Sequence, residues 1–183
     1  KRIIAIVFVF AVVGAAISFL LPQKWTSKAV VTPAEQTQWS EVQQMLVALQ
    51  VLDVDVSVKR GEIFNLFIKK FQSQSLLEDY IKSSPYVMEQ LQGADVDPLD
   101  LHRAVVSIAE KMKAVDNSAA KDADKAPYTS WTLSFTAPTA KDAQVVLNGY
   151  IAYISAIVEK ETMLNIRNVL ALKTRMEKER LDL

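Results

Sequence analysis

Hydrophobic residues in the last quarter of the chain, residues 139–183, recur at spacings of three and four. This spacing predicts a helix with a narrow apolar stripe, formed by Val146, Tyr150, Tyr153, Ile157, Leu164, Val169, Leu172, Met176 and Leu183. Thr139 can cap the start of the helix, and a carboxylate at Asp142 suits the free N–H groups of its first turn. Because these 45 residues contain no proline and one glycine, we predict one helix of about 68 Å. No capping signal precedes Leu183, so we expect the helix to continue past that residue.

A continuous apolar run occupies residues 3–21 and contains no charged side chain. As a helix it would be about 28 Å long, which matches a hydrocarbon core of roughly 30 Å. A cleaved signal peptide is the alternative, but the run is longer than a usual signal core and no small-x-small site precedes Gln23. We therefore predict a transmembrane helix, with Lys24 and Trp25 at the membrane interface.

Alternating and β-branched positions predict a small sheet between these two helices. The expected strands are residues 25–32, 114–117 and 128–136, with a further extended segment at 54–58. Shorter apolar periodicities predict helices at 39–49, 62–82 (one broken helix or two), 85–91 and 98–112. The predicted fold class is α+β: a transmembrane helix (1–21), a membrane-proximal α/β base with a small sheet (22–138), and the first part of a long extended helix (139–183).

Candidate catalytic groups are few. Asp53 and Asp55 share one face of an extended segment and would suit a general acid and base or a metal pair, but a solvated strand face is the favoured interpretation. The acidic cluster Asp95, Asp97 and Asp100 precedes a helix, where capping explains it without calcium. The single histidine, His102, is expected on a helix surface, and there is no cysteine and no glycine-rich phosphate-binding motif. The sequence predicts neither an enzyme nor a bound cofactor or metal.

Charge is balanced, with 21 basic and 21 acidic side chains. Nucleic acid is therefore not an expected partner. The long helix carries a local basic surplus at Arg167, Lys173, Arg175, Lys178 and Arg180. These residues are candidates for facing glycan, although a solvated face with i, i+4 ion pairs is the favoured alternative. Val169, Leu172 and Met176 are candidate contacts with helices of the same or a neighbouring subunit.

Five segments together carry a resemblance to a known family. They are LPQKWTSKAVVTP (21–33), FNLFIKKFQSQSLLEDY (64–80), SSPYVMEQL (83–91), LDLHRA (99–104) and YTSWTLSFTAPTAKDAQ (128–144). The chain resembles the Wzz-type polysaccharide co-polymerases, the chain-length determinants of bacterial O-antigen, and within them the branch that regulates very long chains. Pro22, Lys24 and Trp25 match the signature that follows the first membrane span in this family.

The resemblance implies a bacterial inner-membrane protein with a cytoplasmic N-terminus and a mostly periplasmic chain, of which the second membrane span is missing here. It implies a ring-shaped homo-oligomer that works with a Wzy-type polymerase on lipid-linked O-antigen polysaccharide and sets its modal length without catalysis. The alternative from another class is a periplasmic coiled-coil adaptor subunit of a secretion or efflux assembly. A co-polymerase fused to a tyrosine kinase would need a P-loop, which these residues lack.

Overall fold

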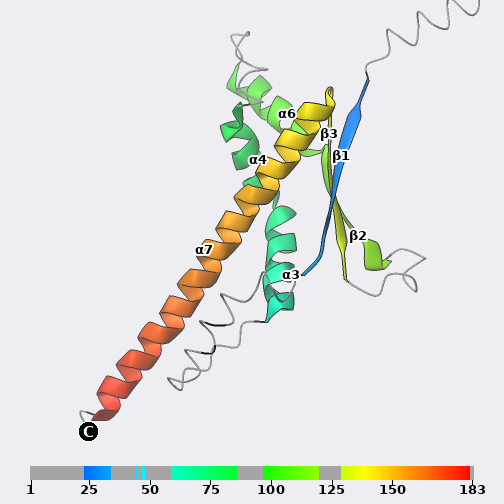
Figure 1. The fold of residues 1–183 in the computed structure, drawn as a ribbon. Coiled ribbons are helices and arrows are strands. Elements are labelled where there is room, and N and C mark those ends of the chain that lie inside the picture. Colours follow the sequence, from blue (N-terminus) through cyan, green and yellow to red (C-terminus); the bar gives the residue numbers. More distant parts are fainter. Residues whose placement is uncertain are drawn as a thin grey trace, which may run out of the picture.

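The computed structural model describes residues 23–33, 59–85, 97–119 and 129–181, together with Gln44 and Val47. The predicted membrane span, Pro22, Asp53, Asp55, Asp95 and Leu183 lie outside these residues, as do nearly all of the predicted helices at 39–49 and 85–91 and the extended segment at 54–58. Within the described ranges the fold is α+β, with a small sheet, three short helices and one long helix (Figure 1). No helix in those ranges combines the length and apolar character that crossing a membrane requires.

Three strands form one antiparallel sheet in the order β1-β3-β2. The strands are β1 (Trp25–Val31), β2 (Met112–Asp116) and β3 (Trp131–Ala137). All three predicted strands are confirmed, although β2 begins two residues earlier than expected and β3 begins at Trp131. Leu133, Phe135 and Ala137 of β3 are buried, whereas the residues between them are partly exposed. The predicted alternation therefore places one face of the sheet on the core.

The apolar segment between residues 60 and 83 forms two helices rather than one. Helix α3 (Arg60–Phe71) ends at Gln72, and α4 (Gln74–Ser83) begins directly after Ser73. Each helix buries one narrow apolar face, Phe64, Ile68 and Phe71 in α3 and Leu77 and Ile81 in α4. The break lets two short helices with different axes both cover the core.

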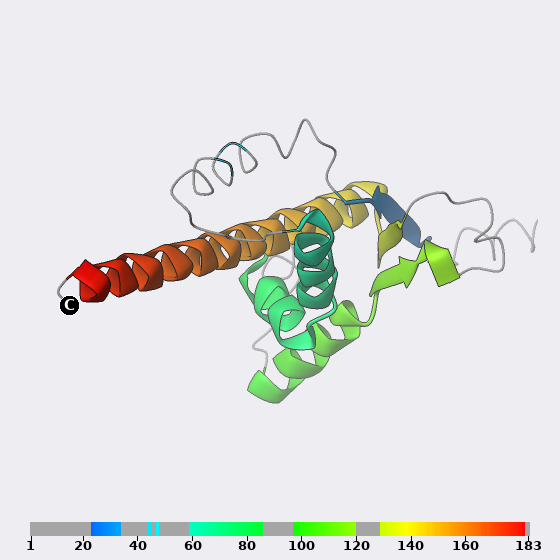
Figure 2. The same cartoon turned by 90° about the horizontal axis from the view of Figure 1, so that it is seen from below.

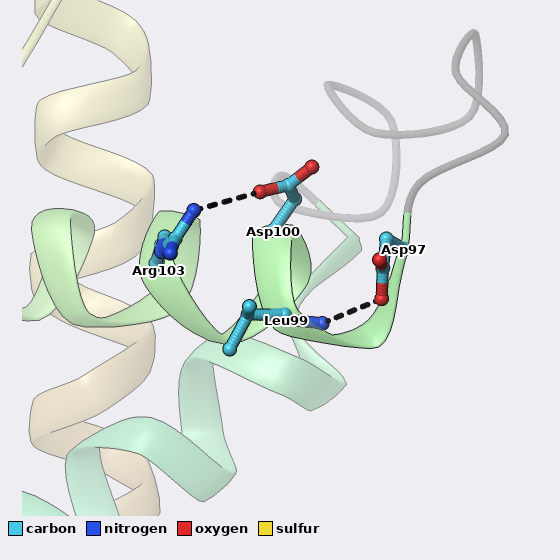
Figure 3. Close-up of polar contacts among 4 residues, drawn as sticks. All are labelled: Asp97, Leu99, Asp100 and Arg103. Atoms are coloured by element: carbon cyan, nitrogen blue, oxygen red, sulfur yellow. Dashed lines mark hydrogen bonds and ion pairs between the residues drawn. The ribbon is translucent and has the colours of Figure 1, made fainter.

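Helix α6 (Pro98–Ala109) begins at the acidic cluster, as capping predicts. The Asp97 carboxylate accepts a hydrogen bond from the Leu99 N–H at 3.1 Å, while Asp100 pairs with Arg103 at 3.3 Å (Figure 3). A short 3₁₀ turn, η1 (Asn117–Ala119), follows β2. The role of Asp97 in capping is confirmed, and both described carboxylates of the cluster have protein partners.

The long helix α7 runs from Ala140 to Leu181, and its predicted start is confirmed. The Thr139 hydroxyl oxygen accepts a hydrogen bond from the Asp142 N–H at 3.1 Å and donates one to the Asp142 carboxylate. Figures 1 and 2 show α7 crossing the base beside the sheet and α3 and then continuing well past them. At 1.5 Å per residue its 42 residues span about 63 Å.

The core lies where the first half of α7 packs against the sheet, α3 and α4. The residues of α7 buried there are Ala143, Val146, Leu147, Tyr150, Ile154 and Val158. Of the predicted stripe, Val146 and Tyr150 are buried, and Tyr153 and Ile157 are partly buried against the same core. The most deeply buried row instead continues through Ile154 and Val158, and Leu164 is 46% exposed. The reason is that apolar residues cover a wide arc of this helix, and the position of the base selects the row containing Ile154 and Val158.

Aromatic side chains join α3, α4 and α7. The ring centroids of Phe71 and Tyr150 are 4.8 Å apart, and those of Tyr80 and Tyr150 are 5.2 Å apart. The Tyr150 hydroxyl donates to the Phe71 carbonyl at 2.9 Å, and the Tyr80 hydroxyl donates to the Val146 carbonyl at 3.2 Å. The cluster thus combines apolar burial with hydrogen bonds for both buried hydroxyl groups.

Candidate functional site

The residues predicted to make helix contacts lie in the second half of α7, which is mostly exposed but buries Ile166. Val169 is 40% exposed, and Leu172 and Met176 are each 61% exposed. Burying such side chains would remove apolar area from water, which stabilises an association by about 25 cal/mol per Å². These three residues are consequently available to a partner.

The same three residues continue the buried face of α7. Positions along this face follow spacings of three, four and four: Leu147, Tyr150, Ile154, then Val158, Glu161, Asn165, then Val169, Leu172, Met176. Three turns for eleven residues is 3.67 residues per turn, close to the 3.6 of a straight helix, so the row stays on one side. We call this row the α7 seam. Its first part is buried against the base and its last part is exposed.

The middle of the seam is polar. Glu161 forms an ion pair with Lys70 of α3, with Nζ and Oε2 2.6 Å apart, and both side chains are partly exposed. A pair exposed to this extent contributes at most about 1 kcal/mol to stability. The ion pair joins α3 to the middle of α7.

The basic residues of α7 do not form a single group. Arg167, Arg175 and Lys178 line one shallow groove, open to solvent, together with Leu170, Ala171 and Thr174. Lys173 and Arg180 are not part of its lining. Arg175 also pairs with Glu179 four residues on, with Nε and Oε1 3.0 Å apart. At 100° per residue the groove lies on the side of the helix opposite the seam, so the apolar and basic surfaces of α7 are separate.

The residues of the predicted membrane signature lie at one end of the sheet. Trp25 is the first residue of β1, is 50% exposed, and pairs with Ala137, the last residue of β3. Lys24 is exposed immediately before it. Since α7 begins three residues after Ala137, its start lies at this same end of the sheet (Figure 1).

Catalytic groups do not gather in the described part of the chain. His102 lies exposed on α6, as predicted, and no group of three or more His, Asp or Glu side chains in those ranges is close enough to hold a metal ion. Burial raises the pKa of the Tyr80 phenol. Burial, and then the neighbouring Tyr153, raise the pKa of Tyr150 above its ordinary value of 10. Both phenols hydrogen-bond to backbone carbonyls in the core, which is a structural role.

Sequence reasoning missed the close approach of α4 to α7. Gly149 lies directly under the Tyr80 ring, and a Cβ atom at that position would overlap the Tyr80 hydroxyl. The available signal was the single glycine inside an otherwise glycine-free helix, because glycine there costs helix stability and indicates a packing requirement.

Two comparisons connect the chain with known proteins. Residues 1–84 match the family model Wzz, chain length determinant protein. Over 182 residues the chain is 60% identical to the ferric enterobactin transport protein FepE of Escherichia coli (strain K12). This match covers 99% of the chain but 48% of that relative, so the chain spans about half the relative's length.

Members of this family are inner-membrane proteins with a periplasmic domain and are non-enzymatic regulators of chain length. The prediction that this chain is not an enzyme agrees with the non-enzymatic character of this family. The family-model match includes the post-span signature, and the 60% identity extends over the sheet and α7. The resemblance seen in the five segments is thereby confirmed: the chain is similar to the Wzz chain-length determinant proteins, through the family model over residues 1–84 and through the 60% identical relative over nearly its whole length.

Proposed function

We propose that this protein regulates the modal length of lipopolysaccharide O-antigen, as a ring-forming inner-membrane co-polymerase that acts with a Wzy-type polymerase on lipid-linked O-antigen polysaccharide. The observation that carries the proposal is the similarity to the Wzz chain-length determinants, since polysaccharide chain length is what this family regulates. The same similarity favours a co-polymerase over a secretion or efflux adaptor.

The geometry supports a protein that stands on a membrane. Trp25 follows Leu21, the end of the predicted span, after only three intervening residues, and the four steps between them cover at most about 14 Å in an extended chain. The Trp25 end of the sheet is accordingly the end next to the bilayer. Helix α7 starts at this end and runs past the opposite end of the base (Figure 1). Its far end therefore stands well away from the membrane, on the periplasmic side in this proposal.

The α7 seam supports assembly. Val169, Leu172 and Met176 are exposed on the face that packs against the base nearer the root of the helix. We assign them to contacts with helices of the same or a neighbouring subunit, because identical apolar stripes on like subunits generate contacts that can close into a ring. Arg167, Arg175 and Lys178 lie on the other side. We assign this basic groove to solvent, in keeping with the Arg175–Glu179 pair.

A deletion strain complemented with the full-length gene tests the proposed function. We expect the complemented strain to show a narrow modal band of long O-antigen on a lipopolysaccharide gel, and the deletion strain to lose that band while still making polymer. An identical ladder in both strains, with the gene expressed and a Wzy-type polymerase present, would exclude a role in chain length.

Ferric enterobactin transport is the second candidate, because the 60% identical relative carries that function in its name. The same two strains separate the candidates. Growth with ferric enterobactin as the sole iron source should be equal in both if the protein sets chain length. Loss of that growth in the deletion strain, with an unchanged O-antigen ladder, would favour transport.

A further inference from the structure

Exposed lysines gather at the end of the sheet where Trp25 pairs with Ala137. Lys24 precedes β1, Lys28 lies within it, Lys111 and Lys113 flank the first residue of β2, and Lys141 lies in the first turn of α7. All five side chains are exposed. We call these five residues the basic rim.

The strand register brings the rim together from three separate parts of the sequence. Lys28 and Lys113 are both opposite Ser134 of β3, one from each side, so they stand in one row across the outer face of the sheet. That row lies three residues from the Trp25–Ala137 pair, or about 10 Å. Lys111 precedes Met112, which is opposite Phe135 two residues from the same pair. Every rim lysine therefore lies within roughly one screening length of this end at physiological salt.

Acidic neighbours do not cancel this charge. Among the described residues at this end, Glu110 precedes Lys111, and Asp142 follows Lys141 and is hydrogen-bonded to Thr139. No ion pair among the described residues engages a rim lysine; those pairs join Lys70 to Glu161, Arg103 to Asp100 and Arg175 to Glu179. The excess is local, because the whole chain has no formal net charge.

Hydroxyl groups stand between the lysines on the same outer face. Thr26 and Thr136 face each other across β1 and β3 with their hydroxyl oxygens 2.9 Å apart, and Ser134 lies between Lys28 and Lys113. Half-exposed Trp25 pairs with buried Ala137, so its side chain lies on the other face of the sheet at this same end, and an indole prefers the headgroup level of a bilayer. Ammonium and hydroxyl donors on the outer face suit a surface of phosphate oxygens.

We propose that the basic rim binds the anionic phospholipid headgroups of the leaflet on which the base stands, and so holds the sheet at a fixed height and orientation on the bilayer. The proposal rests on the membrane placement in the proposed function. It adds that the base itself contacts lipid through charge, beyond the attachment given by the predicted span.

The test uses the full-length protein in nanodiscs made from equal parts of phosphatidylglycerol and phosphatidylcholine. After gentle detergent transfer, native mass spectrometry counts the lipids of each kind that the protein retains. We expect phosphatidylglycerol to be enriched at least about fivefold, the ratio that one well-placed lysine gives near an anionic surface. Raising the salt to about 0.5 M should reduce the enrichment, because exposed charges are screened.

Three variants assign the enrichment to the rim. Replacing Lys28, Lys111, Lys113 and Lys141 by glutamine should bring the retained lipids back to the mixing ratio, whereas replacing the same four by arginine should keep the enrichment. The matched control changes four exposed cations of α7 that lie away from this end to glutamine, namely Lys160, Arg167, Lys178 and Arg180, and should behave as the parent. Circular dichroism of each variant shows whether the base is folded.

Equal retention of both lipids by the parent would overturn the proposal, as would unchanged enrichment in the folded glutamine variant. Loss of enrichment in the control variant to the same extent would do so too, because it would show a non-specific charge effect. These outcomes are independent of chain-length control, since no O-antigen is present in the nanodiscs. A deletion strain with a normal O-antigen ladder would refute the proposed function and leave the lipid result unaffected.

Discussion

At the scale of single residues, Gly149 lets α4 approach α7. The Tyr80 hydroxyl reaches the Val146 carbonyl across the glycine, so the hydrogen bond and the missing side chain depend on each other. An isolated glycine within a helix costs about 1 kcal/mol relative to alanine. The contact between Tyr80 and the α7 backbone offsets this cost.

Gly149→Ala should destabilise the protein despite the better helix propensity of alanine. Overpacking typically costs 1–3 kcal/mol, so we expect a net loss of about 1–2 kcal/mol in denaturant unfolding. In a Tyr80→Phe background the overlapping hydroxyl is gone, and the same change should cost close to nothing. An equal cost in both backgrounds would show that the two residues are not coupled.

Tyr150→Phe should remove the buried hydrogen bond to the Phe71 carbonyl and cost about 1–2 kcal/mol at pH 8. The pKa of Tyr150 is raised in the folded state, so the folded protein keeps the phenol proton at a pH where the unfolded chain releases it. The parent must then lose stability as the pH rises above about 10, by up to about 1.4 kcal/mol per pH unit. The variant lacks this contribution. The urea midpoints of parent and variant should therefore be closer together at pH 11 than at pH 8. An equal difference between the two midpoints at both pH values would contradict the assignment.

At the scale of elements, the α7 seam changes from buried to exposed along a single face. Between these parts lies the Lys70–Glu161 pair, which joins the seam to α3. Beyond it the seam residues Val169, Leu172 and Met176 are still apolar although nothing in the described part of the chain covers them. Such continuity is expected if the seam meets further helices.

Leu172→Asp should disturb the assembly, because a charge buried in a helix interface without a partner costs several kcal/mol. We expect smaller oligomers by light scattering in detergent and a shifted O-antigen length. The matched control is Leu170→Asp, which lies in the same turn, is also exposed, and is about 160° away around the helix. Arg175→Ala should likewise leave the oligomer intact. A parental oligomer and parental polymer length in Leu172→Asp would show that the seam does not organise the ring.

Local signals in the sequence predicted most of the elements. Asp97 and Thr139 are caps whose chemistry acts within a few residues, and both were correct. The signals for the three strands, and for a possible break between α3 and α4, were equally local in the sequence. The deeper burial of Ile154 and Val158 compared with Tyr153 and Ile157 was not predictable, because both rows are apolar and only the packed base distinguishes them. The order β1-β3-β2 also depends on pairing between residues far apart in the sequence.

The exposed candidate site residues also divide into those that the sequence pattern identified and those that only the structure grouped. Leu172 and Met176 were identified from spacing alone, and their exposure agrees with a contact role, which stays a prediction. The separation of Arg167, Arg175 and Lys178 from Lys173 and Arg180 required the helix geometry. The rim lysines were not recognised as a group, since Lys28, Lys113 and Lys141 lie far apart in sequence and only the register brings them together.

At the scale of the whole molecule, attachment to the bilayer is the first property to establish. If residues 3–21 span a membrane, the full-length protein should stay in the pellet after alkaline carbonate extraction, because burial of an apolar helix in lipid does not depend on charge. Removal of the rim charges by the four glutamine substitutions should not release it. Recovery of the parent in the supernatant would exclude a membrane span.

The pairing of Trp25 with Ala137 places the start of α7 at the Trp25 end of the base, which is the end next to the bilayer in the proposed function. Helix α7 is then a lever whose pivot is the core around Tyr150 and whose long arm, from Tyr150 to Leu181, is about 47 Å of a single helix. A tilt of about 5° at the pivot displaces the far end sideways by roughly 4 Å. In any ring built from such helices, the diameter at the far ends is accordingly set at the base, by how tightly the aromatic side chains pack against α7. Changes of a few degrees in this packing produce larger displacements at the far end of the helix.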